Sequence, residues 1–198
     1  MLNLPGQELS LAIGPHLLIF NYDKGDTKLV YDFAWCSADD PDTWEASSSN
    51  SAGSLTIREA NTEIKAVAQL GDALAVYTED QMFLVSYKGA PFYFGYRPVM
   101  ASGVGAVSVS CIIPVDRVNY GLSRRGLFVT DGVSVKSIGV DDGIDNWIRD
   151  NIAVSEYPQV SGFHNKRDSE VVWFLPVGDT KPTKELFYNY DTGLFGLR

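Results

Sequence analysis

The sequence predicts an all-β fold built from repeated antiparallel four-stranded sheets, with one short inserted helix. Three observations support this prediction. Apolar and polar residues alternate with a period of two, tight-turn pairs separate the alternating segments, and the whole pattern recurs along the chain. Because side chains of a strand point alternately to its two faces, such alternation is typical of strands that have one buried face.

The clearest unit begins at Glu63. Between residues 63 and 70 every even-numbered position is apolar, which predicts one buried face. The pairs Gly71-Asp72 and Glu79-Asp80 are turn signals, and β-forming residues lie on both sides of each pair. Residues 92–94 follow a break that contains Pro91. This unit is predicted to contain three or four antiparallel strands.

The same pattern predicts three further units. An earlier unit has predicted strands at residues 8–13, 16–22 and 28–33. A later unit has predicted strands at 106–113, 118–122, 126–130 and 133–138, with a hairpin turn at Asp131-Gly132. The last unit has predicted strands at 159–163, 170–175 and 185–190. Another strand is expected to begin after the turn at residues 191–193.

The spacing of the units indicates a repeat architecture. With Glu63, Gly105 and Tyr157 in register, the spacings are 42 and 52 residues. Repeats of roughly 40–50 residues, each a four-stranded meander, are typical of β-propeller blades, although a β-sandwich also has regularly spaced short strands. Blades would need sheets with two apolar faces, as in residues 74–77 and 171–175. We predict that residues 1–198 form a single β-propeller-like domain, closed or partial, or a fragment of one.

The inserted helix is predicted at residues 141–152. Asp141, Asp142 and Gly143 supply N-cap chemistry, and the apolar residues that follow have helical spacing. Asp145 in the first turn and Arg149 further on suit the helix dipole. The predicted buried stripe contains Ile144, Trp147, Ile148 and Ile152.

A long loop is predicted at residues 34–54. It contains Trp35, Trp44 and a serine-rich run at residues 47–51. Loops of this length inside a domain are usually functional or contact a partner. The two tryptophans indicate that one end of the loop is held by packing, and we select them as candidate interface residues.

A second candidate contact is the pair Arg124 and Arg125, which lies between two predicted strands. The pair could dock against carboxylates of a neighbouring protein or against a phosphate, because the guanidinium group binds such groups in a bidentate manner. The alternative is an ordinary solvated turn.

No catalytic, cofactor-binding or metal-binding residues can be selected from the sequence. His16 and His164 are the two histidines, and Cys36 and Cys111 are the two cysteines, with no metal-ligand spacing among them. The acidic residues at 39–42 and 141–145 do not follow the pattern of a calcium loop. A nucleophile elbow, a phosphate-binding loop and a dinucleotide-binding fingerprint are also missing from the sequence. We therefore predict a protein without enzymatic activity and without a cofactor.

Charge and composition limit the classes of binding partner that the sequence predicts. The formal net charge is −9, and the basic residues are scattered, so the sequence does not predict a surface that wraps nucleic acid. Two cysteines are too few for a disulfide-dense secreted scaffold. An apolar run of membrane-spanning length and a signal peptide are both lacking, so no membrane partner is predicted.

Several strings resemble a known group of proteins. They are DPDTW at residues 40–44, SAGS at 51–54, EIKAVAQLGDALAVYTEDQMFLVSYKGAPFYFGYR at 63–97, YGLSRRGLFVTDGVSVKSIG at 120–139 and LFYNYDTGLFG at 186–196. In this order they resemble the β-propeller-containing tail hub, nozzle (tail tubular) and packaged-DNA-stabilisation proteins of short-tailed bacteriophages. The resemblance covers about residues 30–196 and rests on strand-and-turn motifs. Members of that group are usually longer, which puts a closed propeller in this chain in doubt.

The resemblance implies a virion structural protein of the tail or head–tail connector, synthesised in the host cytoplasm. It would form a ring of identical copies, with six as one expected number, together with other tail or connector proteins. DNA would pass through the lumen as non-specific cargo during ejection, and an acidic lumen would not retain phosphates. The alternatives are a carbohydrate- or receptor-binding tail module, with Trp44, Tyr93 and Tyr96 as candidate stacking platforms, and an enzyme on a propeller scaffold.

Overall fold

The computed structural model describes residues 9–101 and 103–198, and its strands form four antiparallel sheets of four strands each. In every sheet the spatial order of the strands follows the chain. The first sheet contains β1 (Leu9–Ile13), β2 (His16–Lys24), β3 (Thr27–Trp35) and β4 (Gly53–Thr56). The second contains β5 (Ala66–Leu70), β6 (Ala73–Tyr77), β7 (Met82–Gly89) and β8 (Tyr93–Pro98). The third contains β9 (Ile113–Val115), β10 (Val118–Ser123), β11 (Gly126–Thr130) and β12 (Val135–Ser137). The fourth contains β13 (Ser161–Asn165), β14 (Glu170–Leu175), β15 (Lys184–Asn189) and β16 (Leu194–Leu197).

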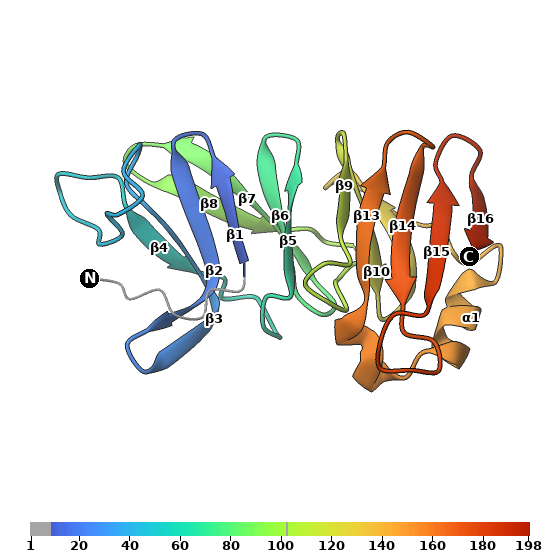
Figure 1. Cartoon of the computed structure of the whole chain (residues 1–198). Helices are drawn as coiled ribbons and strands as arrows, with labels where there is room; N and C mark the ends of the chain where they lie inside the picture. Colours follow the sequence, from blue (N-terminus) through green and yellow to red (C-terminus); the bar gives the residue numbers. More distant parts are fainter. Residues whose placement is uncertain (1–8, 102) are drawn as a thin grey trace.

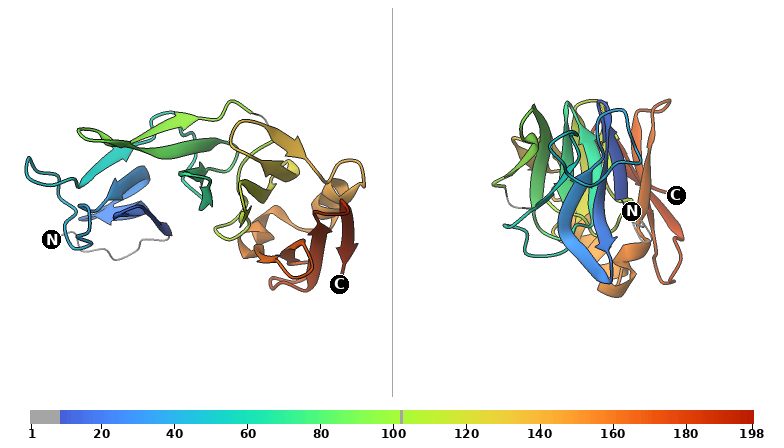
Figure 2. Two further views of the ribbon diagram at one scale, coloured as in Figure 1. Left: turned by 90° about the horizontal axis from the view of Figure 1, so that it is seen from above. Right: turned by 90° about the vertical axis from the view of Figure 1, so that its left-hand side faces the viewer.

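The prediction of an all-β fold with repeated four-stranded sheets is confirmed. The sheets follow one another around an arc, with the first and fourth sheets at its two ends (Figures 1 and 2). Contacts between sheets join the first strand of each sheet to its neighbours, namely β1 to β5, β5 to β9 and β9 to β13. This is the arrangement of successive propeller blades. Closure of the arc into a ring stays a prediction.

The core lies between the faces of neighbouring sheets. In β6, Leu74 and Val76 belong to the apolar cluster shared with the first sheet, whereas Ala75 and Tyr77 belong to the cluster shared with the third and fourth sheets. All four side chains are buried. The second sheet is therefore covered on both faces, as the sequence pattern predicted for blades.

The predicted hairpin turns are present. Gly71-Asp72 connects β5 to β6, Glu79-Asp80 lies between β6 and β7, and Asp131-Gly132 follows β11. The carboxylate of Asp131 accepts hydrogen bonds from the amides of Val133 and Ser134, at 2.9 and 2.7 Å. These hydrogen bonds from the peptide N–H groups of Ser134 and Val133 stabilise the ionised carboxylate, so the pKa of Asp131 lies below its ordinary value.

The strand predicted at residues 106–113 is wrong over most of its length. The strand β9 begins at Ile113, and the preceding residues cross irregularly from the second sheet to the third. Backbone hydrogen bonds to other strands fix the start of this crossing, because the amide of Ala106 donates to the Thr78 carbonyl and that of Val107 to the Leu122 carbonyl. The second, third and fourth sheets thus begin at residues 66, 113 and 161, which gives spacings of 47 (113 − 66) and 48 (161 − 113) in place of 42 and 52.

The insertion forms the helix α1 (Ile144–Asn151), followed by a 3-10 helix at Val154–Gln159 that was not predicted. The N-cap residue is Gly143, one of the three residues predicted to supply the cap, but neither Asp141 nor Asp142 caps the helix with its side chain. Ile148 and Ile152 are buried as predicted, while Ile144 and Trp147 are half-buried. Asp145 is also buried, which the sequence did not indicate.

The bounds of the predicted long loop change. The long loop covers residues 36–52 and not 34–54, because residues 34 and 35 belong to β3 and residues 53 and 54 to β4. Glu8, predicted to start the first strand, lies outside the described residues. The strand expected after residue 193 is β16, which completes the fourth sheet.

Candidate interaction surface

The loop at residues 36–52, called the acidic loop below, connects two neighbouring strands at one end of the arc (Figure 1). Its two ends are adjacent because Trp35 of β3 is paired with Gly53 of β4. The amide of Cys36 donates to the Leu17 carbonyl at 3.0 Å, and the amide of Ser37 donates to the Thr43 carbonyl at 2.8 Å. The base of the loop is therefore held by backbone hydrogen bonds.

Both candidate interface tryptophans are buried in the protein interior and anchor this loop there. Trp35 is 5% exposed, and its indole N–H donates to the Ser51 carbonyl at 2.6 Å. Trp44 is 8% exposed; its indole N–H donates to the Pro41 carbonyl at 2.7 Å, and its ring belongs to an apolar cluster with Ile19. The packing predicted for the tryptophans is present, and they leave little surface for direct contact with a partner.

The tip of the acidic loop is closed by its own polar groups. The side chain of Asn50 accepts from the amide of Ser47 at 3.2 Å and donates to the Glu45 carbonyl at 2.9 Å. Ordering a residue of free backbone costs about 1–2 kcal/mol. Because these bonds already order the loop, a partner would not have to supply that free energy.

The exposed side of the loop is acidic. Asp39, Asp40, Asp42 and Glu45 are all exposed, and residues 36–52 include no lysine, arginine or histidine. A shallow recess at the tip is lined by residues 42–47 and Asn50. Four carboxylates on an ordered loop favour a basic partner surface and repel phosphates.

Arg124 and Arg125 lie elsewhere, in the turn between β10 and β11 of the third sheet. Arg124 forms an ion pair with Glu79, which ties this turn to the β6–β7 turn of the second sheet. The Arg124 side chain is 53% exposed, so the pair contributes at most about 1 kcal/mol. The carbonyl of Arg125 accepts from the guanidinium of Arg149 at 3.4 Å. The structure thus does not bring the arginines together with the tryptophans.

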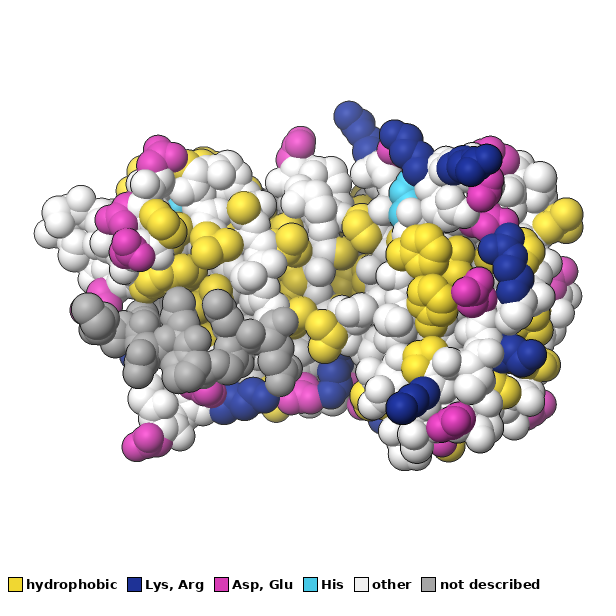
Figure 3. Space-filling view, viewed as in Figure 1, with side chains coloured by type: hydrophobic (Ala, Val, Ile, Leu, Met, Phe, Trp, Pro, Cys, Tyr) yellow, Lys and Arg dark blue, Asp and Glu magenta, His cyan; other side chains and the backbone are white. Residues whose placement is uncertain are grey.

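Sequence reasoning missed a second surface, the far face of the fourth sheet. We use this name for the face that points away from the third sheet. Phe163, Val172, Phe174 and Phe187 share this face, and Phe163 is 45% exposed. Figure 3 shows hydrophobic side chains gathered over β13 and β14. The sequence signal for this surface is the apolar run at residues 171–175, which places apolar side chains on both faces of β14 but does not indicate whether another sheet covers the second face.

The described histidines and Cys111 have contacts inside the protein. Among residues 9–101 and 103–198, no group of three or more His, Cys, Asp or Glu side chains is placed to hold a metal ion. His16 is buried and bonded through Nδ1 to the Cys36 carbonyl at 2.8 Å, and His164 lies 3.1 Å from the Tyr190 hydroxyl. Cys111 is buried, and burial raises the pKa of its thiol, which opposes formation of a reactive thiolate.

No protein-family model matches the sequence, and no curated protein matches it significantly. In the part of the chain that the structure describes, none of the helices has the length and apolar character needed to cross a membrane.

Proposed function

We propose that this chain is a structural component of a bacteriophage tail or head–tail connector, a hub- or nozzle-like subunit of a ring around the DNA conduit. The observation that carries the proposal is the row of four meander sheets packed face to face around an arc (Figure 2). This is the architecture that the resemblance to phage tail propeller proteins implies. In this proposal the chain is located in the virion tail and is synthesised in the host cytoplasm.

The charge of the chain supports a role beside moving DNA. The formal net charge is −9, so carboxylates outnumber basic groups on the chain. Carboxylates repel phosphates over about 8 Å at physiological ionic strength. A conduit with such a surface would let DNA slide during ejection without binding it, so DNA is a non-specific cargo in this proposal.

Assembly, and not catalysis, is the proposed activity. The ring would contain identical copies, with six as the first number to test, and would contact other tail or connector proteins. An ordered acidic loop and an exposed apolar sheet face are features suited to protein contacts. The proposal assigns the chain no enzymatic reaction, no cofactor and no membrane partner.

The first test is the location of the protein. Virions of the phage that encodes the chain would be purified and analysed by mass spectrometry, with electron microscopy of immunolabelled particles. We expect the chain in the virion at several copies, with label at the tail or the neck. Its absence from purified infectious virions would overturn the proposal.

The second test asks whether the acidic loop contributes to assembly. The triple variant D39N/D40N/D42N removes three exposed charges and keeps an oxygen acceptor for the Asp40 carboxylate bond to the Asp42 amide. A matched control, D26N/D72N/D116N, removes three exposed charges outside the loop. We expect reduced incorporation into tails for the loop variant and near-normal incorporation for the control. Equal incorporation would remove the loop from the assembly mechanism.

The carbohydrate-binding alternative has weaker support. Trp44 is buried, and Tyr93 and Tyr96 are half-buried. The Tyr96 hydroxyl donates to the Glu59 carboxylate at 2.7 Å. These rings therefore offer little stacking surface to a sugar. A glycan array with the purified chain would test the alternative directly.

A further inference from the structure

The far face of the fourth sheet has three rows of side chains, each crossing all four strands. Strand pairing sets the rows as Asn165, Glu170, Asn189 and Leu194; then Phe163, Val172, Phe187 and Gly196; then Ser161, Phe174, Glu185 and Arg198. The first row is mostly polar and the middle row is apolar. The opposite face of the sheet, which carries Val171 and Trp173, packs in the apolar cluster shared with the second and third sheets. Both faces of the fourth sheet are therefore apolar at the centre.

The middle row is exposed at Phe163 of β13, whereas Val172 of β14 is buried and the row is covered on β15 and β16. The ring of Phe187 lies against Gly196, where even a Cβ atom would come within 2.1 Å of it. The guanidinium of Arg198 sits over that ring, 4.2 Å from its centre. On the other half, Phe163 and Phe174 stack with ring centres 5.7 Å apart, and Phe163 stays 45% exposed.

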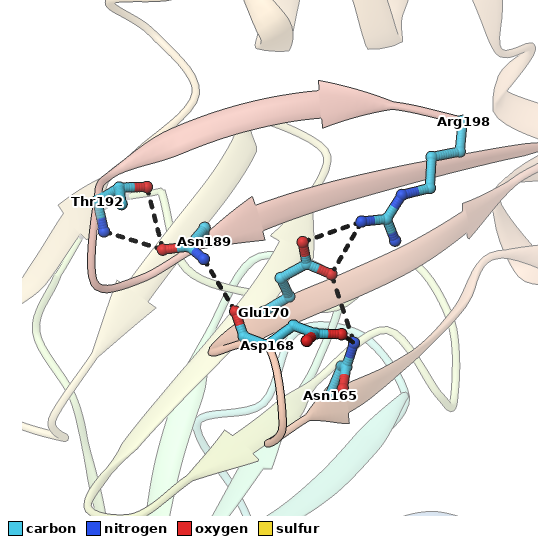
Figure 4. Close-up of polar contacts among 6 residues, drawn as sticks. All are labelled: Asn165, Asp168, Glu170, Asn189, Thr192 and Arg198. Atoms are coloured by element: carbon cyan, nitrogen blue, oxygen red, sulfur yellow. Dashed lines mark hydrogen bonds and ion pairs between the residues drawn. The ribbon is translucent and has the colours of Figure 1, made fainter.

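A polar network holds one edge of the face in place (Figure 4). Arg198 donates to both oxygens of Glu170, at 3.0 and 3.2 Å, so the buried carboxylate of Glu170 is paired. Asn165 donates to Asp168 at 2.9 Å, and Asn189 donates to the Asp168 carbonyl at 2.9 Å. The stacked phenylalanines thus lie beside a preorganised frame, which lowers the entropy cost of docking.

Exposed cations flank the same face. Lys166 and Arg167 are exposed in the β13–β14 turn, and Lys184 is exposed at the start of β15. Figure 3 shows Lys and Arg side chains above and beside the hydrophobic side chains of this end of the molecule. The acidic loop, at the opposite end of the arc, has four exposed carboxylates and no basic residue. Lys166 and Arg167 are therefore opposite in charge to the acidic loop, while the exposed carboxylate of Asp168 lies in the same turn as these two cations.

We propose that the far face of the fourth sheet docks onto the first-sheet end of a second copy of this chain, with Lys166 and Arg167 facing its acidic loop. The contact continues the pattern inside the chain, where each of the first three sheets is covered by the next. A symmetric contact between two far faces would instead leave Lys166 and Arg167 without the acidic loop as a partner. Head-to-tail contacts generate rings or filaments, and closure into a ring rests on the proposed function.

The test measures self-association of the full chain by sedimentation velocity over a concentration series. We expect reversible, salt-sensitive association. The variant F163S should weaken it at least about tenfold in Kd, as for an aromatic at an interface centre. The control V133S changes a valine that is 80% exposed in the turn after β11, away from both proposed contact surfaces, and should leave association unchanged. Circular dichroism and Tm would confirm that both variants fold.

An experiment with charge-reversal variants identifies the two surfaces that form the contact. K166E/R167E and D39K/D40K/D42K should each self-associate poorly, because each brings like charges together. An equimolar mixture of the two should associate, because both cross-contacts then pair opposite charges. A wild-type chain that stays monomeric at its highest soluble concentration, an F163S variant with unchanged Kd, or a mixture no better than its components would overturn the docking proposal. These results are independent of whether virions contain the protein, so failure here is distinguishable from failure of the proposed function.

Discussion

The hydroxyl of Tyr77 and the side-chain amide of Asn119 lie 3.0 Å apart in the interior between the second and third sheets. With the amide NH₂ donating to the carbonyls of Gln69 and Val118, at 2.9 and 3.2 Å, the amide oxygen accepts from the hydroxyl. Burial raises the pKa of Tyr77, so its hydroxyl stays a donor at physiological pH. One buried polar pair thus joins two sheets that otherwise meet through apolar side chains.

The substitution Tyr77→Phe should destabilise the protein. It removes the donor and leaves the Asn119 oxygen buried without that partner, which costs about 1–2 kcal/mol of unfolding free energy. Chemical denaturation would measure the change. Tyr31→Phe is the matched control, because Tyr31 is partly exposed. Equal stability of Tyr77→Phe and the wild type would show that the pair adds nothing to the contact between sheets.

Asp145 should make stability depend on pH. Its carboxylate is 3% exposed and accepts from the Leu127 amide at 2.8 Å and from the Ser137 hydroxyl at 3.5 Å. Burial is the largest effect and raises the pKa of Asp145, while the Leu127 amide bond and the charge of Arg149 oppose it. Because the folded protein binds this proton more tightly than the unfolded chain does, ionisation of Asp145 lowers stability as pH rises through the raised pKa.

We therefore expect Asp145→Asn to gain stability relative to the wild type as the pH rises from about 4, near the ordinary pKa of an aspartate, to 7. The amide oxygen of the variant can still accept from Leu127. Urea denaturation of both proteins at several pH values gives the difference in unfolding free energy. A difference that is constant over this range would contradict the prediction.

Gly162 sets the distance between the third and fourth sheets. A Cβ atom at this position would lie 2.7 Å from the Ile113 side chain and 2.8 Å from the Val172 carbonyl oxygen. Gly162→Ala should therefore cost about 1–3 kcal/mol through overpacking. Gly95→Ala is the control, since the closest atom to a Cβ there is a Lys88 side-chain carbon at 3.5 Å. Thermal melts of the two variants should differ clearly, and similar melts would show that the sheets can shift apart at little cost.

The two anchoring tryptophans should act on different parts of the molecule. Trp35→Phe loses the bond to Ser51 and leaves a gap beside Phe94, whose ring centre is 5.1 Å from that of Trp35, so we expect a global loss of about 1–3 kcal/mol. Trp44→Phe loses the bond to the Pro41 carbonyl and should loosen the loop with a smaller global loss.

Amide hydrogen exchange separates the two effects. Trp35→Phe should speed exchange at Ala38, whose amide donates to the hydroxyl of Ser51 at 2.7 Å. Trp44→Phe should speed exchange at Ser37, whose amide donates to the carbonyl of Thr43. Unchanged exchange at both positions would show that other contacts order the loop.

The assignment of strands and turns was accessible from sequence because its causes are local. The alternation of residues 64–70 and the turn chemistry of Gly71-Asp72 act within a few residues, and the β5–β6 hairpin follows them. The long loop was also accessible from local composition, since its serine-rich run and Trp44 are visible in the sequence. The same local reasoning failed at residues 106–112, where an alternating sequence forms an irregular crossing between sheets, with buried residues at 106–108 and 111–112 and exposed residues at 109 and 110.

The sequence by itself therefore determined that this protein consists of repeated antiparallel sheets joined by short turns, because alternation and turn residues act over short distances. The tertiary structure alone decided which faces are covered. It placed Trp35 and Trp44 in the protein interior, buried Asp145 with a hydrogen bond from the Leu127 amide, and left Phe163 exposed. These outcomes depend on which sheet packs on which, and residues far apart in the chain determine that packing.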